Sequence, residues 1–226
     1  MSLRAIVFDF DGVIANSEPL HLRAFRDVLA QEGVALAEPD YYARYLGFDD
    51  VGVFRKIGED RARTWNDAQI GDLVSRKGAR FEGLERDVSM LFPGAADAVR
   101  RAAAAVPVAI ASGARGTEIR RVLDREGLTA SFAAIVAAED TAAGKPSPDP
   151  YLHAVARLSS ALHGPVAARD CVAIEDSEWG LESARTAGLR TVGVAHMYPA
   201  AELSGADLVL TSIDLLDVSA LQRLCS

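Results

Sequence analysis

Two aspartates, one residue apart, follow directly on a short apolar run near the start of the chain. The run is Ala5-Ile6-Val7-Phe8, and Asp9, Asp11 and Gly12 come after it. Because alternate residues of a strand share a face, both carboxylates can converge on the mouth of a sheet. A metal ion and a phosphoryl group suit such a place, whereas a core does not, because unpaired buried charges are expensive. Taken alone, the pair also fits a turn in which aspartates bond to nearby backbone.

Three further apolar runs are followed by residues with matching chemistry. In open α/β sheets, ligands bind outside the carboxyl ends of the strands, so these residues should meet the first pair at one edge. They are Ser112 after 106–111, Lys145 in the loop after 134–137, and Glu175 with Asp176 after 171–174.

These residue types match the requirements of phosphoryl transfer. One carboxylate can attack phosphorus to form an aspartyl phosphate, and a second can protonate the leaving oxygen and then activate water. A hard divalent cation with oxygen ligands gathers the developing charge. Ser112 and the backbone N–H groups of Gly113 and Ala114 can hold phosphate oxygens at a helix start, and Lys145 neutralises the remaining charge.

Each of these residues also has a plain structural interpretation. Asp176 and Ser177 can cap a helix, Lys145 can be a solvated loop lysine, and Ser112 is a common turn residue. Their placement at successive strand ends, in chain order, favours the catalytic interpretation of the set.

The composition limits the classes of partner. The chain has 226 residues, 50% of them hydrophobic, and a net charge of −8, with no basic stretch. Nucleic acid and anionic membrane partners are therefore disfavoured, and an anionic substrate would need a local cation. Cys171 and Cys225 lack metal-ligand spacing, and the N-terminus leads straight into a strand. We expect a cytoplasmic protein without a signal peptide, and nothing in the sequence requires more than a monomer.

Short Val- and Ile-rich runs alternate with amphipathic segments, which predicts an α/β fold. The runs do not alternate polar and apolar residues, so we expect a parallel, Rossmann-like sheet with helices on both faces. Residues 15–90 break this rhythm with helical patterns at 17–33, 41–46, 51–57 and 66–80. We therefore expect a catalytic core of residues 1–14 and 91–226, with a helical cap of residues 15–90 inserted after strand one.

The motifs together resemble a known superfamily. D-F-D-G-V from Asp9, then Ser112, G-K-P-x-P-D-P from Gly144, and I-E-D-S-x-x-G from Ile174 are similar to the motifs of the haloacid dehalogenase superfamily. The helical insert resembles that of the subgroup containing β-phosphoglucomutase and phosphoglycolate-type phosphatases. The resemblance covers essentially the whole chain, and it implies that strand one lies at the centre of the sheet.

The resemblance also implies roles for single residues. Asp9 would be the nucleophile and Asp11 the general acid/base. The Asp9 carboxylate, the Asp11 backbone carbonyl and the Asp176 carboxylate would bind Mg²⁺. Glu175 would either join the metal through water or pair with Lys145. The remaining groups would contact the phosphoryl group or the substrate: Ser112, Lys145, Gly12, Gly113 and Ala114.

Residues of the cap bear on substrate choice. His21 can assist Asp11 or the substrate, as a histidine here does in relatives, or it can be a packing or surface residue. The segment 44–50 resembles the cap loop that sets substrate choice, but Asp49 and Asp50 stand where β-phosphoglucomutase has an arginine for a second phosphate. Acidic groups there disfavour a mutase, unless Arg55 or Lys56 substitutes through a different loop arrangement.

The sequence thus predicts a Mg²⁺-dependent phosphatase for a small phosphorylated metabolite such as a sugar phosphate. The presence of Asp11 argues against dehalogenation, because the dehalogenases of the superfamily lack this second aspartate. Two alternatives remain open. One is a phosphomutase of the β-phosphoglucomutase type, and the other is a non-catalytic metal- or ligand-binding protein on the same fold.

Overall fold

The chain divides into two compact units. The computed structural model describes residues 2–46, 48–86 and 88–226. One unit comprises Met1–Asn16 with Met90–Ser226, and the other comprises Ser17–Ser89. The first unit extends slightly beyond 1–14 and 91–226 because its two connecting stretches pair: Ala15 forms a β-bridge with Leu91, and the Asn16 N–H donates to the Met90 carbonyl at 2.5 Å.

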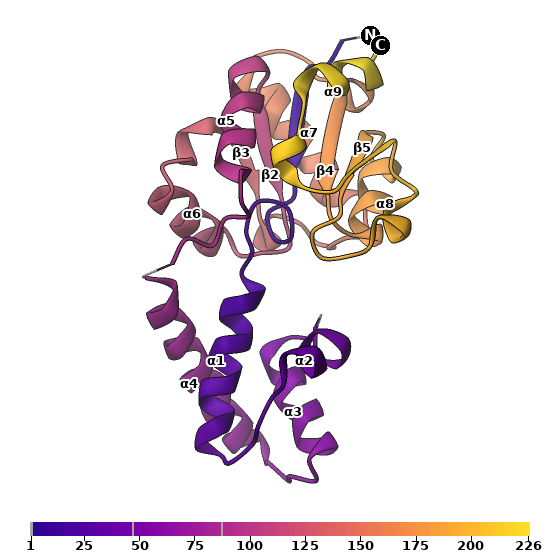
Figure 1. Ribbon diagram of the computed structural model, residues 1–226. Coiled ribbons are helices and arrows are strands. Elements are labelled where there is room, and N and C mark those ends of the chain that lie inside the picture. The colour runs from indigo at the N-terminus through magenta and orange to yellow at the C-terminus, as the bar shows by residue number, and fades with distance from the viewer. Residues whose placement is uncertain (1, 47, 87) are drawn as a thin grey trace. The chain divides into compact units, whose positions relative to one another are not determined.

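The first unit is built on a parallel sheet, as expected. Within the described residues the sheet has six strands in the order β3-β2-β1-β4-β5-β6, so that β1 lies at the centre (Figure 1). Each pairing is parallel. The strands are β1 (Ala5–Phe8), β2 (Val108–Ala111), β3 (Phe132–Val136), β4 (Cys171–Glu175), β5 (Arg190–Val194) and β6 (Leu208–Leu210).

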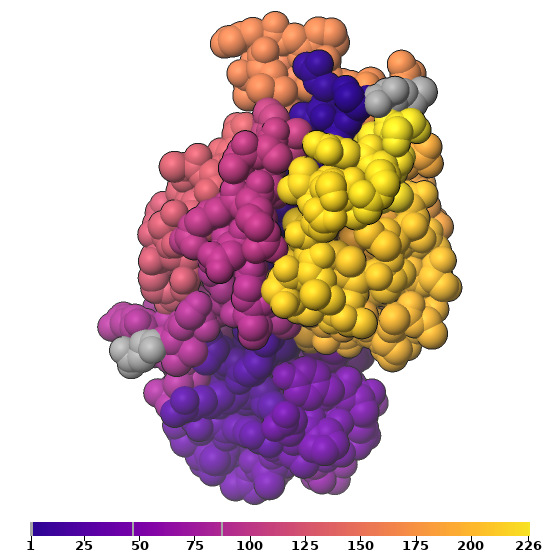
Figure 2. Space-filling model, turned by 45° about the horizontal axis from the view of Figure 1, so that its top comes forward, coloured from indigo at the N-terminus to yellow at the C-terminus, as the bar shows by residue number. Residues whose placement is uncertain are grey.

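Helices cover both faces of this sheet. Ala5 and Val7 of β1 pack in one cluster with Tyr151 and Leu158 of α7 and with Ala184 of α8. On the other side α5 contacts β2 and α9, and Figure 2 shows the yellow C-terminal segment beside the magenta segment that contains α5. The helices are α5 (Ala95–Ala105), α6 (Gly116–Arg125), α7 (Asp149–Ala161), α8 (Glu178–Thr186) and α9 (Val218–Leu224).

Two strands begin two residues away from their expected starts. β2 starts at Val108 rather than at Val106, because Val106 is the C-cap of α5 and Pro107 has no N–H to donate. β3 spans Phe132–Val136 rather than 134–137. It is an edge strand and mostly half-buried, and its start coincides with the start of the apolar run at Phe132.

The second unit is helical. It contains α1 (Glu18–Gln31), α2 (Glu38–Arg44), α3 (Asp50–Asp60) and α4 (Asp67–Glu85). Asn66 and Gln69 form a capping box at the start of α4, which satisfies backbone donors that no helical carbonyl can reach. Phe25, Phe54 and Leu73 are buried in one apolar cluster between these helices. No helix within the described ranges combines the length and the apolar character needed to cross a membrane.

Candidate active site

Three carboxylates converge at the carboxyl ends of the two central strands. Phe8 of β1 is in register with Ile174 of β4, and the Asp9 N–H donates to the Ile174 carbonyl at 2.8 Å. Asp9 and Glu175 therefore leave adjacent strands side by side, and Asp176 follows. Each of the three offers an oxygen within 4.8 Å of the others. All three are buried, Glu175 completely.

Lys145 lies between two of these carboxylates. Its Nζ is 2.8 Å from Asp9 Oδ1 and 2.5 Å from Glu175 Oε1. Of the two arrangements expected for Glu175, the ion pair with Lys145 is therefore present. The loop between β3 and α7 carries Lys145 to the sheet edge, as the strand-end argument anticipates.

Both oxygens of Glu175 are occupied by donors. Besides Lys145, Oε1 accepts a hydrogen bond from the Tyr151 hydroxyl at 2.7 Å. Oε2 accepts from the Asp176 N–H at 3.1 Å and from the Ser177 hydroxyl at 3.3 Å. A buried carboxylate with this many donors is a fixed point of the site. Glu175 therefore orients Lys145 and the start of α8.

The cluster holds more negative charge than its protein partners compensate. Burial raises the pKa of Asp176 to about 8, and the charges of Asp9 and Glu175 add to the shift. Burial also raises the pKa of Asp9 to about 7, although the Lys145 ammonium opposes it. For Lys145, burial acts to lower the pKa, but the charges of Asp9 and Glu175 outweigh burial and raise it. Three carboxylates thus face one ammonium group among the residues that the structure describes.

The donor set fits a magnesium ion. Mg²⁺ prefers oxygen ligands and is usually held in proteins by one or two carboxylates. Asp9 and Asp176 supply carboxylate oxygens within 4.8 Å of one another. A divalent cation here would also balance the charge of two carboxylates whose pKa values are raised mainly by burial. We therefore regard this cluster as a candidate Mg²⁺ site.

The loop after β1 is tightly wound around Gly12. Gly12 has a φ of +77°, which favours glycine, and a Cβ at this position would lie 2.0 Å from Asp176 Oδ2. Its N–H donates to the Ala15 carbonyl at 2.9 Å. The Asp11 side chain is exposed, and among the described acidic groups it is not part of the buried cluster. An exposed carboxyl group outside the buried cluster is compatible with a proton-transfer role for Asp11.

The Ser112 segment lies at the end of the neighbouring strand. Ser112 is 3% exposed, and its Oγ accepts a hydrogen bond from the Ala114 N–H at 3.0 Å. Gly113 between them is exposed, and α6 begins at Gly116. Since β2 pairs with β1 in parallel, Ser112 and Asp9 leave the sheet at the same edge. The Ser112 hydroxyl and the exposed backbone at Gly113 are groups that can bind phosphoryl oxygens. The Ala114 N–H donates to Ser112, and the Gly116 N–H at the start of α6 donates to Glu139 at 3.1 Å.

His21 belongs to the helical unit and is engaged there. Its Nδ1 lies 2.6 Å from Lys77 Nζ, and its ring packs on Phe81 with centroids 4.3 Å apart. Burial, together with the Lys77 charge, lowers the pKa of His21 to about 4. His21 is therefore neutral at pH 7 and accepts the hydrogen bond from Lys77. These contacts fit the packing interpretation and leave a substrate role as a prediction.

The acidic residues of the cap loop also have partners in this unit. Asp49 accepts the Gly52 N–H at 2.7 Å as the N-cap of α3. Asp50 Oδ1 lies 2.7 Å from the Nζ of Lys77, which is 2% exposed. Gly47, which the resemblance includes in this loop, lies outside the described residues.

Sequence reasoning missed the role of one residue in the cluster. Tyr151 was expected only on the apolar face of a helix, but its hydroxyl binds Glu175, and Lys145 Nζ lies 5.3 Å from its ring centroid. A buried tyrosine hydroxyl usually requires a partner. Because Tyr151 lies only six residues after Lys145, this rule could have predicted that its hydroxyl binds a polar group of the site.

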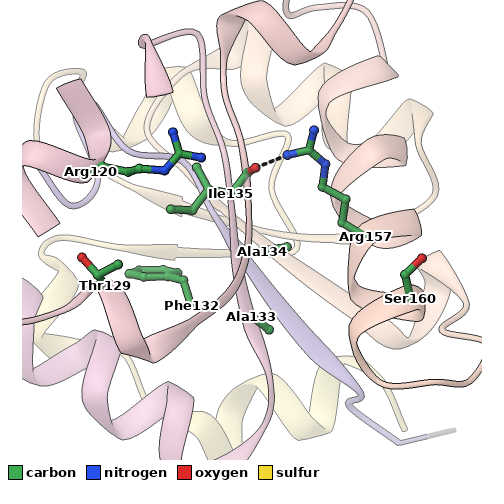
Figure 3. Close-up of a pocket in the computed structure, with 8 residues that line it drawn as sticks. All are labelled: Arg120, Thr129, Phe132, Ala133, Ala134, Ile135, Arg157 and Ser160. Carbon is green, nitrogen blue, oxygen red and sulfur yellow. Dashed lines mark hydrogen bonds between the residues drawn. The ribbon is translucent and has the colours of Figure 1, made fainter. Parts of the chain in front are cut away.

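A separate pocket lies along the outer edge of β3, with a volume of about 400 Å³. Figure 3 shows Arg157 reaching across this edge to donate to the Ile135 carbonyl. Arg157 also forms an ion pair with Asp140 at 2.6 Å. None of the described residues that line the pocket is a candidate catalytic residue. The Arg157 contact protects a free strand edge, and it gives no reason to place chemistry there.

Comparison with known proteins places the chain in a family. Residues 3–188 match the model of the haloacid dehalogenase-like hydrolases. CbbY of Rhodobacter capsulatus is 32% identical over 227 residues, which cover 97% of this chain and 96% of that protein. The β-phosphoglucomutase of Bacillus subtilis is 29% identical over 98% of this chain and 95% of its own length. Hexitol phosphatase B of Escherichia coli strain K12 is 31% identical over 84% and 82%.

Solved structures agree with this assignment. A crystal structure of a CbbY variant from Rhodobacter sphaeroides, in complex with xylulose-(1,5)bisphosphate, is similar with a TM-score of 0.74 at 28% identity, covering 96% of each chain. The chain belongs to the haloacid dehalogenase-like hydrolases. It is an enzyme of this family, and its curated relatives include named phosphatases.

Proposed function

We propose that this enzyme is a Mg²⁺-dependent phosphatase that hydrolyses a small phosphorylated metabolite through an aspartyl phosphate on Asp9. The observation that carries the proposal is the Asp9 carboxylate, which lies 2.8 Å from Lys145 inside a cluster with excess negative charge. A cation can complete this arrangement, and an anionic phosphoryl group can then approach the nucleophile.

The chemistry uses two carboxylates in turn. An oxygen of Asp9 attacks phosphorus, the ester P–O bond breaks, and Asp11 donates its proton to the leaving oxygen. Asp11 then takes a proton from water, whose oxygen attacks phosphorus, and the acyl–phosphate bond to Asp9 breaks to give free phosphate. Lys145, held by Asp9 and Glu175, stabilises negative charge on the phosphoryl oxygens, and Ser112 with the Gly113 N–H binds them. When bound, Mg²⁺ supplies charge stabilisation and orients the phosphoryl group.

We further propose that the helical unit selects the substrate, and its charges favour a monophosphate. Arg55 lies 2.9 Å from Asp67, and Lys56 lies 3.2 Å from Glu59. Both cations that could substitute for the arginine of a mutase are therefore already paired. A sugar phosphate or a related polyol phosphate, with a neutral hydroxylated end, is the substrate class that this supports.

A phosphomutase is the second candidate, because the Bacillus subtilis β-phosphoglucomutase aligns over nearly the whole chain. The two activities differ in product. A phosphatase releases inorganic phosphate, whereas a mutase exchanges the phosphoryl group between two positions of a sugar and releases little.

The test is phosphate release with Mg²⁺ across sugar monophosphates, sugar bisphosphates and phosphoglycolate, with Asp9→Asn as the blank. We expect release that requires both Mg²⁺ and Asp9, with a sugar or polyol monophosphate as the best substrate. Substantial turnover by a pure Asp9→Asn sample would remove Asp9 as the nucleophile. Isomerisation of a sugar phosphate without release would establish the mutase instead.

A further inference from the structure

His196 binds the backbone of the loop that carries the two motif-one aspartates. It follows β5 by two residues, and both of its ring nitrogens have partners. Nδ1 lies 3.1 Å from the Gly12 carbonyl oxygen, and Nε2 lies 3.1 Å from the Ile213 backbone nitrogen. Since the Ile213 N–H can only donate, Nε2 accepts, and the proton on Nδ1 donates to Gly12. The two partners thus define one neutral tautomer.

The ring of His196 is also held by stacking. It lies on Phe92 with centroids 3.9 Å apart and planes at 25°. Phe92 belongs to the segment that re-enters the core, where its N–H donates to the Ile14 carbonyl at 3.0 Å. His196 therefore connects three chain segments that are far apart in sequence: the loop after β1, the re-entering segment and the turn after β6.

Gly12 transmits this contact to the reacting groups. It is the residue after Asp11, and it packs so closely on Asp176 that a Cβ would lie 2.0 Å from Oδ2. A rotation of the Gly12 peptide would therefore displace both aspartates. Asp11 would move because it is bonded to Gly12, and Asp176 would move because it packs against Gly12. In its surroundings, burial lowers the pKa of His196, whereas the Gly12 carbonyl and the Asp214 charge act to raise it. The net shift is downward, which agrees with a neutral ring.

We propose that His196 is a positioning residue for the phosphatase reaction, acting through its Nδ1–H bond to the Gly12 carbonyl. The proposal rests on the proposed function. The two ring nitrogens have different roles in this proposal. Nδ1 supports Asp11 and Asp176 through Gly12, whereas Nε2 supports only the turn at Ile213. A misplacement of about 1 Å in a catalytic group can cost about a hundredfold in rate, so one hydrogen bond at this point is sufficient to matter.

Two matched substitutions separate the two sides. In His196→Asn the side-chain amide sits near the former Nδ1 and keeps a donor for Gly12. In His196→Gln the amide sits near the former Nε2 and keeps an acceptor for Ile213. Both lose the stacking on Phe92. Phe92→Leu serves as the packing control, because it removes the stacking and leaves both hydrogen bonds of His196 intact.

The measurements are kcat and KM with the best phosphate ester, the melting temperature, and the Kd for Mg²⁺ by calorimetry. For His196→Gln we expect kcat to fall by about tenfold or more with KM nearly unchanged, and Mg²⁺ binding to weaken. His196→Asn and Phe92→Leu should stay within about threefold of the wild-type kcat. All three variants should melt at lower temperature than the wild type.

Other results would overturn the inference. Equal kcat values for His196→Asn and His196→Gln would reduce His196 to a structural role, as would a tenfold loss in Phe92→Leu. If His196→Gln does not fold, the other two variants decide, because a large loss of kcat in either contradicts the proposal. A wild type that releases no phosphate would reject the proposed function instead. The Mg²⁺ affinities of the two His196 variants would then test the inference independently, and equal values would overturn it.

Discussion

Replacing Gly180 with alanine should destabilise this enzyme, although the same change usually stabilises a helix. Gly180 lies in the first turn of α8, where alanine is favoured over glycine by up to about 1 kcal/mol. A Cβ at this position would, however, lie 2.0 Å from three atoms of the Glu175 carboxyl group. Ordinary contact begins at 3.4 Å, so the carboxylate would have to retreat by roughly 1.4 Å, the difference between these distances.

The cost follows from the partners that Glu175 would lose. A retreat of this size breaks its hydrogen bonds to Lys145 and Tyr151, which are 2.5 and 2.7 Å long. Hydrogen bonds to charged groups contribute about 1.5–3 kcal/mol each, so the loss is about 3–6 kcal/mol. After the helix gain, we expect the free energy of unfolding to fall by about 2–5 kcal/mol. Displacement of Lys145 should also lower kcat by about a hundredfold.

Urea unfolding and phosphate release measure the two effects. The control is Gly71→Ala in α4, where a new Cβ meets nothing within 4 Å. This control should be unchanged or slightly stabilised, by up to about 1 kcal/mol, with normal kcat. A Gly180→Ala protein as stable and as active as Gly71→Ala would show that the Glu175 carboxylate is not fixed where the structure has it.

Three further predictions address single groups. Tyr151→Phe removes the hydroxyl that binds Glu175 and should lower the free energy of unfolding by about 1–3 kcal/mol in urea titrations, and unchanged stability would contradict this buried contact. Asp11→Asn should lower kcat strongly while sparing Mg²⁺ binding in calorimetry, and a collapse of metal affinity would give the Asp11 side chain another role. The neutral His21 has a folded-state pKa of about 4 against the ordinary 6.5, so the unfolded chain takes up the proton first. The free energy of unfolding should therefore fall as the pH is lowered from 6.5 to 4, and it should fall more in the wild type than in His21→Asn. Parallel curves of unfolding free energy against pH for the two proteins would contradict a buried neutral His21.

The sequence predicts the central strands well because both their faces are buried. β1 begins and ends at the expected residues, and each of its residues is fully covered. The bounds of the edge strand β3 are less predictable, because its apolar run continues beyond Val136 to Ala138. The start of α2 at Glu38 is also less predictable, because the Pro next to Glu38 is equally typical of a loop. The helical unit was expected from the absence of strand patterns.

The candidate site was predictable only where a residue follows a strand. Asp9, Ser112 and Asp176 could be placed by this rule, and the resemblance paired Lys145 with Glu175 as one of two options. The position of the His196 ring could not be predicted in this way, because its partners are backbone groups of Gly12 and Ile213, which are far away in sequence. Backbone contacts leave no signature in residue types, so only the folded chain reveals them.

Without metal, the buried negative charges of the acidic cluster should lower the stability of the enzyme. Removing one of these charges by Asp176→Asn should therefore raise it. The folded-state pKa of Asp176 is about 8 against an ordinary 3.8, so the folded chain holds a proton that the unfolded chain releases. With EDTA, stability from Asp176 is therefore complete below pH 3.8 and is lost as the pH rises through 8.

At pH 8 without metal, Asp176→Asn should melt a few degrees higher than the wild type, because about 1 kcal/mol corresponds to about 2–4 °C in a chain of this size. Mg²⁺ should reverse the order by stabilising the wild type and not the variant. The control Asp97→Asn, an exposed carboxylate paired with Arg100 in the same unit, should follow the wild type in both conditions. An equal rise with Mg²⁺ in Asp176→Asn would exclude Asp176 as a ligand, and the excess charge at the sheet edge would then need another explanation.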